Sequence, residues 1–149
     1  MKRLLLAVLI GVALSGCAQF NRIFNIASNE TPLVVVANGE VKEVTPDPLR
    51  FSNERGKVTI YWQAPSGYRF SAKNGIFING ELIGGPRGKL EPNQNEVVEC
   101  GPANAERSEF SCFNRNSRPG TYKYTVNLET AEGKPLKPFD PSIINGRDM

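Results

Sequence analysis

The sequence predicts an all-β domain downstream of Thr31, built as a β-sandwich or a small barrel. Apolar and polar residues alternate with a period of two in several short segments, most clearly in Lys57–Gln63 and Thr121–Glu129. Turn-forming residues separate these segments, and no segment after Thr31 keeps a helical period over ten residues. Eight or nine short strands at regular spacing are typical of sandwiches and barrels.

The expected strands follow one another closely along the chain. Asn38-Gly39 lies between two β-branched runs and predicts a type I′ hairpin. Trp62, Tyr122 and Tyr124 lie on the apolar faces of their strands and are expected in the core. Segment 80–92 contains four glycines and two prolines and is expected to form a long surface loop. The predicted strands are Leu33–Ala37, Glu40–Val44, Lys57–Gln63, Tyr68–Ser71, Gly75–Asn79, Glu96–Cys100, Ser108–Phe113, Thr121–Glu129 and Ser142–Ile144.

The first seventeen residues form a segment of a different kind. Two basic residues precede the apolar run Leu4–Leu14, which is too short to cross a bilayer core of about 30 Å. The stretch Leu14-Ser15-Gly16-Cys17 resembles a bacterial lipobox, and the whole segment resembles a lipoprotein signal peptide; ordinary secretion is the alternative. We therefore predict a signal peptide at residues 1–16, a lipidated Cys17 with a tether at residues 17–31, and a β-sandwich domain at residues 32–149.

The lipoprotein resemblance also implies a location. The cysteine of a lipobox carries acyl chains, and two or more chains hold a protein stably on a membrane. In lipoproteins of Gram-negative bacteria, an Asp after the cysteine commonly retains the protein at the inner membrane. Ala18 stands there in this chain. The resemblance thus implies an outer-membrane protein that faces the periplasm and meets the membrane through its lipid anchor.

Two further cysteines remain once Cys17 is set aside. In an oxidising compartment, the pair Cys100 and Cys112 indicates one disulfide. In the chain-entropy model, such a bridge contributes roughly 3 kcal/mol of stability. Metal binding and free thiols are the alternatives, but two thiolates without histidine make a poor metal site. No metal is expected.

The segment Pro119-Gly120-Thr121-Tyr122-Lys123-Tyr124-Thr125-Val126 resembles the penultimate strand of immunoglobulin-like and cupredoxin-like sandwiches. The resemblance implies that Gly120 permits the corner and that the ring of Tyr122 packs inside. It also implies that the Tyr122 hydroxyl bonds to nearby backbone, as in a tyrosine corner. The predicted fold is therefore a single immunoglobulin-like or cupredoxin-like β-sandwich with one disulfide hairpin.

Copper-binding cupredoxins carry a cysteine ligand at the position of Val126, followed by a histidine. This chain has no histidine at all, whereas a blue-copper centre needs two imidazoles and a thiolate. We expect no copper site and no cofactor. The same absence excludes Ser-His-Asp and Cys-His nucleophilic sites.

A carboxylate-based hydrolase remains open on composition alone. Its candidate acids lie around the two cysteines, at Glu96, Glu99, Glu106 and Glu109. In a simple hairpin Glu99 would face Phe113 and Glu109 would face Ala103, so the two acids would not be partners. We expect these glutamates on solvated strand faces and in a polar turn.

Charge gives no support for nucleic-acid binding. The leader holds two of the eighteen basic residues, so that sixteen remain against fifteen acidic ones. Nucleic-acid binding needs clustered Lys and Arg instead. The glycine-rich segment at residues 84–89 lacks the spacing of a phosphate-binding loop.

One local basic cluster stands out near the disulfide hairpin. Arg107, Arg115 and Arg118, together with Phe113, are the predicted binding patch for a protein, glycan or phospholipid head group; a solvated charged turn is the alternative. The leading hypothesis is a membrane-anchored, non-enzymatic binding or structural module of the cell envelope, with a protein or glycan partner. The alternatives are a carboxylate-dependent hydrolase of envelope glycans and a periplasmic inhibitor of a host hydrolase.

Overall fold

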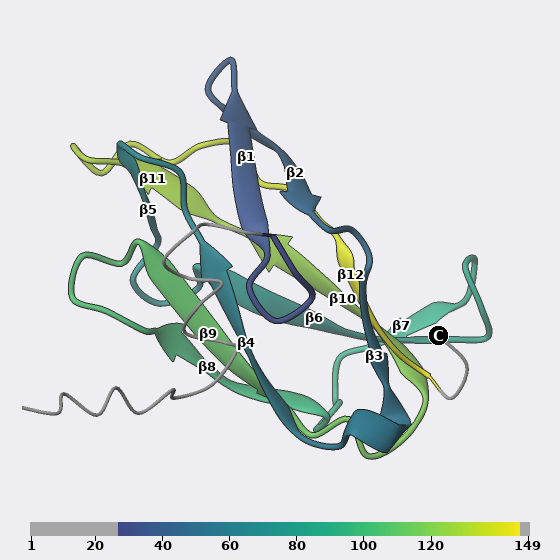
Figure 1. Ribbon diagram of the computed structural model, residues 1–149. Coiled ribbons are helices and arrows are strands. Elements are labelled where there is room, and N and C mark those ends of the chain that lie inside the picture. Colours follow the sequence, from purple (N-terminus) through teal and green to yellow (C-terminus); the bar gives the residue numbers. More distant parts are fainter. Residues whose placement is uncertain (1–26, 147–149) are drawn as a thin grey trace, which may run out of the picture.

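Two five-stranded sheets pack face to face in the computed structural model, which describes residues 27–146 (Figure 1). The first sheet has the strand order β2-β1-β4-β9-β8 and the second the order β3-β12-β10-β6-β7, while β11 and β5 form a small two-stranded sheet. The predicted β-sandwich is therefore confirmed. The predicted signal peptide and Cys17 lie outside the described residues.

Most strand pairs are antiparallel, but β1–β4 and β3–β12 are parallel. The only helical segment among residues 27–146 is a short 3-10 turn, η1, so this part of the chain contains no helix that could span a membrane. The elements are β1 Leu33–Ala37, β2 Glu40–Thr45, β3 Leu49–Ser52, η1 Asn53–Arg55, β4 Val58–Gln63, β5 Tyr68–Phe70, β6 Ile76–Ile83, β7 Lys89–Glu91, β8 Val97–Pro102, β9 Glu109–Asn114, β10 Gly120–Val126, β11 Leu128–Thr130 and β12 Ser142–Gly146.

The expected long loop at residues 80–92 is wrong. Strand β6 continues to Ile83, and β7 pairs back onto it, so that only residues 84–88 form the turn. Gly80 does not end β6. It pairs with Lys123 of β10 next to a register shift, and it has a φ of 147°. A Cβ there would approach the Glu91 carbonyl oxygen to 2.4 Å. Glycine in this strand marks close backbone approach rather than its end.

The alternating run at residues 121–129 divides between two sheets. Strand β10 is the central strand of the second sheet, whereas β11 pairs with β5. The break falls at Asn127, whose N–H donates to the Gly75 carbonyl. The inward face of the run is nevertheless predicted correctly, since Tyr122, Tyr124, Val126 and Leu128 are all at most 1% exposed.

The core is built wholly from side chains between Val34 and Ile143. The first described residues also pair with the backbone of β4. The Tyr61 N–H donates to the Glu30 carbonyl, and the Gln63 N–H donates to the Pro32 carbonyl. The space between the two sheets is thus filled by apolar side chains from residues 27–146. This part of the chain therefore has a hydrophobic core of its own.

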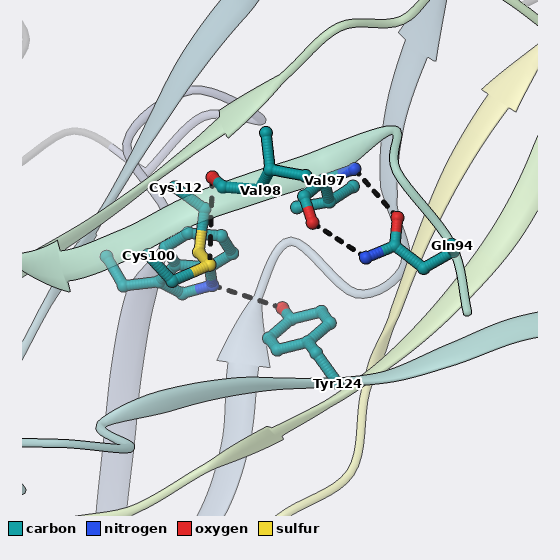
Figure 2. Close-up of a disulfide and its surroundings, with 7 residues drawn as sticks. Gln94, Val97, Val98, Cys100, Cys112 and Tyr124 are labelled. Atoms are coloured by element: carbon teal, nitrogen blue, oxygen red, sulfur yellow. Dashed lines mark hydrogen bonds between the residues drawn. A yellow bond between two sulfur atoms is a disulfide. The ribbon is translucent and has the colours of Figure 1, made fainter. Parts of the chain in front are cut away.

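The centre of the core joins the two middle strands. Trp62 of β4 and Tyr124 of β10 are fully buried, and their rings meet edge to face with centroids 5.4 Å apart. The Trp62 Nε1–H donates to the Tyr124 hydroxyl at 3.2 Å. The predicted disulfide between Cys100 and Cys112 is present and lies on the side of its sheet that faces Tyr124 (Figure 2).

Tyr122 departs from the expected tyrosine corner. Its ring is fully buried, as predicted, but its hydroxyl makes no hydrogen bond within residues 27–146. Gly120 leaves room for that hydroxyl, because a Cβ on Gly120 would lie 2.5 Å from the Tyr122 oxygen. The glycine is therefore needed for the close approach of a side chain.

Tyr124→Phe and Tyr122→Phe form a matched pair with opposite expected results. The first change leaves the buried Trp62 Nε1–H without a partner and should cost about 1–3 kcal/mol of unfolding free energy. The second removes a buried hydroxyl that has no partner and should leave stability unchanged or raise it. Urea unfolding of the unreduced protein measures both. Equal losses would contradict the assigned hydrogen bond.

Candidate functional site

A cluster of charged side chains lies where β6, β10 and the β8–β9 hairpin meet. Arg118 forms a bidentate ion pair with Glu81 of β6, with Nη1–Oε1 and Nη2–Oε2 distances of 2.6 and 2.5 Å. Its Nε lies 3.9 Å from an oxygen of Glu96. Glu81 is 8% exposed and Glu96 only 3%. One arginine therefore joins a buried carboxylate of β6 to a buried carboxylate that directly precedes β8.

Ser117 holds the side chain of Glu96, and Gln94 holds its backbone. Ser117 donates to both Glu96 oxygens, from its N–H at 2.8 Å and from its hydroxyl at 2.6 Å. The Gln94 side chain accepts from the Glu96 and Val97 N–H groups and donates to the Val97 carbonyl. Figure 2 shows the Gln94–Val97 bonds at the start of β8. The expectation of a solvated Glu96 is wrong, because the partners that make its burial possible are distant in sequence.

The electrostatics of the Arg118–Glu81 pair favour its charged form. Hydrogen bonds from Arg118 lower the pKa of Glu81, and Glu81 in turn raises the pKa of Arg118. Burial raises the pKa of Tyr122 to about 12, so that its hydroxyl stays protonated beside them. A glycosidase acid needs a raised carboxyl pKa. The cluster instead holds its charges paired.

A second ion-pair cluster lies at the other end of β9. Glu129 of β11 accepts from Arg69 Nε at 2.8 Å and from Arg107 Nη2 at 2.7 Å. Burial raises the pKa of Glu129, but the bonds from the two arginines outweigh it and the net pKa is lowered. Arg107 thus ties the β8–β9 loop to the small sheet.

The structure does not bring the four residues of the predicted patch together. Arg107 precedes β9 and Arg115 and Arg118 follow it, and this six-residue strand is about 20 Å long. Phe113 is half-buried between them, and Arg115 is exposed. Arg107 and Arg118 pair with different carboxylates, so each is engaged within the fold.

The hairpin register differs in one detail from the expected one. The Ala103 N–H donates to the Glu109 carbonyl, as the simple hairpin requires. Val98 rather than Glu99 pairs with Phe113, because a bulge between Val98 and Gly101 shifts the register. Glu99 lies in that bulge with φ 54°. The two acids are still not partners across the hairpin.

Buried asparagines connect the two sheets near the charged cluster. The side-chain amides of Asn114 and Asn145 exchange two hydrogen bonds of 2.9 and 3.0 Å. Asn116 donates from its side chain to the Ser52 and Gly56 carbonyls. All three asparagines are at most 2% exposed. They are therefore part of the interior, whereas Arg115 and Arg118 of the predicted binding patch are exposed.

The surface grooves of residues 27–146 include two with mainly apolar walls. The first, of about 480 Å³, lies on the outer face of the second sheet and is mainly apolar. Its walls include Leu82, Pro86, Leu90 and Ile144. We call the exposed turn beside it, residues 83–90, the β6–β7 tip. Sequence reasoning missed this surface because it treated the segment as a loop, although Ile83 and Leu90 flank the glycines at hairpin spacing.

The second groove, of about 370 Å³, runs along β1 and the turn after β4. Strand β1 pairs with β4 only at Leu33–Gln63, and beyond that point it continues past the end of β4. The β1–β2 hairpin projects from the sandwich there (Figure 1). Val35 is 38% exposed on this segment. We call this surface the β1 groove.

No protein family matches the sequence, and no curated protein is significantly similar to it. Within residues 27–146, no three His, Cys, Asp or Glu side chains gather closely enough to hold a metal ion. Glu81 and Glu129 are paired with arginines, and the two described grooves have mainly apolar walls.

Glu81→Gln tests the charged cluster through its pH dependence. Because folding lowers the pKa of Glu81 from its ordinary 4.5, its contribution to stability is complete above about pH 4.5 and is lost as the pH falls through the folded-state pKa. The variant should lose about 1–3 kcal/mol at pH 7 and show a weaker decline below pH 4.5. Urea unfolding between pH 3 and 7 measures this, with the exposed Glu106→Gln as control. An unchanged pH slope in Glu81→Gln would contradict the assignment.

Proposed function

We propose that the protein is a lipoprotein of the bacterial outer membrane whose β-sandwich is a non-enzymatic binding or structural module facing the periplasm. The observation that carries the proposal is the leader ending in Leu14-Ser15-Gly16-Cys17, which resembles a lipobox. Acyl chains on Cys17 would keep the domain at a membrane surface, where a small rigid module meets its partners at high local concentration.

The side chains of the domain support a binding role over hydrolysis. A carboxylate-dependent hydrolase needs one carboxyl group held protonated as an acid. The pKa values of Glu81 and Glu129 are instead lowered, because each accepts bonds from arginine. Glu96 is held by two bonds from Ser117. These carboxylates stabilise loops and strand ends.

The β1 groove is the surface that we assign to a protein partner. Past Leu33 the edge of β1 is no longer covered by β4, and its residues are Val34, Val35, Val36 and Ala37. An uncharged strand edge of this kind favours pairing with an extended segment of another chain. The opposite edge at β2 carries Lys42 and Glu43, which oppose such pairing.

Cys17→Ser tests the anchor. The wild-type mature chain should begin at Cys17 and carry the mass of its acyl chains, and it should fractionate with the outer membrane. The variant should be released or remain unprocessed, since serine lacks the thiol that is acylated. Mass spectrometry and membrane fractionation measure this, with Gln19→Ala as the control. Membrane fractionation unchanged in Cys17→Ser would refute the anchor.

A photo-crosslinking residue placed at Val35 tests the partner surface in intact cells. We expect one discrete covalent adduct with an envelope protein, because Val35 lies on the β1 groove. The same residue placed at Glu106, which is exposed on the β8–β9 loop, should give none. Absence of an adduct at 35, or the same adducts from both positions, would refute this surface.

A further inference from the structure

The β6–β7 tip exposes apolar side chains on both of its faces. Ile83 is 48% exposed and Leu90 41% exposed. Leu82 pairs with Leu90 and Ile83 with Lys89, so Leu90 and Ile83 point to opposite sides of the hairpin. The last pair between β6 and β10 is Glu81–Tyr122, and the hairpin therefore extends beyond the body of the second sheet. It projects on the side of the molecule away from β5 and β11 (Figure 1).

The tip is also basic. Arg87 is exposed at the turn, and the Lys89 side chain is 80% exposed. The nearby acids do not cancel this charge. Glu91 forms an exposed pair with Lys89 at 2.7 Å, which contributes little in water. Glu81 is paired with Arg118 inside the fold. The tip thus combines apolar side chains with cations that attract phosphate.

Apolar side chains flanked by cations suit the boundary between lipid head groups and acyl chains. An apolar hairpin that served only the domain's own stability would be buried against it. The chain length also permits membrane contact. Cys17 and Ala27 are ten positions apart in the sequence, and this stretch of chain reaches at most about 35 Å. A domain of this size has a radius of gyration of about 14 Å, so a tether of this length allows its different faces to reach the membrane.

We propose that the β6–β7 tip docks into the phospholipid leaflet to which Cys17 is attached, with Ile83 and Leu90 among the acyl chains and Arg87 and Lys89 at the phosphates. The inference rests on the proposed lipid anchor, which makes docking intramolecular and so allows a small contact to be populated. Docking would hold the sandwich in one orientation on the membrane and fix the direction in which the β1 groove faces.

Ile83→Trp in the acylated, mature protein tests the docking. The protein is reconstituted into vesicles of phosphatidylethanolamine and phosphatidylglycerol in which part of the lipid carries brominated acyl chains. We expect at least a twofold quenching of the new tryptophan's fluorescence relative to unbrominated vesicles. The native Trp62 is fully buried in the core and gives a constant background. Phe77→Trp is the matched control, because Phe77 is 54% exposed near the other end of β6, and it should not be quenched.

Charge reversal by Arg87→Glu and Lys89→Glu in the Ile83→Trp background should abolish the quenching. Circular dichroism confirms that each variant is folded. Vesicle flotation separates the two proposals: protein that fails to float with the vesicles contradicts the anchor. Protein that floats but shows no quenching at position 83, or equal quenching at positions 83 and 77, overturns the docking and leaves the anchor intact.

Discussion

The contact between Trp62 and Tyr124 is the point on which the sandwich depends. These two residues lie on the middle strands of the two sheets, both fully buried, and they meet through an edge-to-face ring contact and one hydrogen bond. The bond matters because both polar atoms are out of water, where an unmet donor is costly. The disulfide of the β8–β9 hairpin lies beside this contact and joins the edge strand β8 to β9, the neighbour of the central strand β4.

Around that centre, polar side chains close the ends of the sandwich. The paired amides of Asn114 and Asn145 join one sheet to the other, and Arg118 joins Glu81 to Glu96. Both arrangements satisfy groups that burial would otherwise penalise. As a result, the most deeply buried carboxylates and amides have their hydrogen-bond partners within the domain. The surfaces that we propose for partner and membrane contact are the β1 groove and the β6–β7 tip.

The proposed contacts together define one orientation of the domain on the membrane. The proposed anchor tethers one end of the chain, and the β6–β7 tip supplies a second, non-covalent contact with the same leaflet. The β1–β2 hairpin is a separate projection of the sandwich (Figure 1). With the tip on the membrane, the β1 groove remains available to an envelope protein. In this proposal the second sheet contacts the membrane and the first sheet contacts the protein partner.

The sequence by itself determined the all-β class, the inward faces of β4 and β10, the first hairpin and the disulfide pair, because alternation and turn chemistry are local properties. Only the tertiary structure decided that Gly80 lies inside a strand, where another backbone comes too close for a side chain. It also decided that Glu96 is buried and that Arg107 and Arg118 serve different carboxylates. Those outcomes depend on partners many residues away, such as Ser117 and Glu129, and no local pattern contains them.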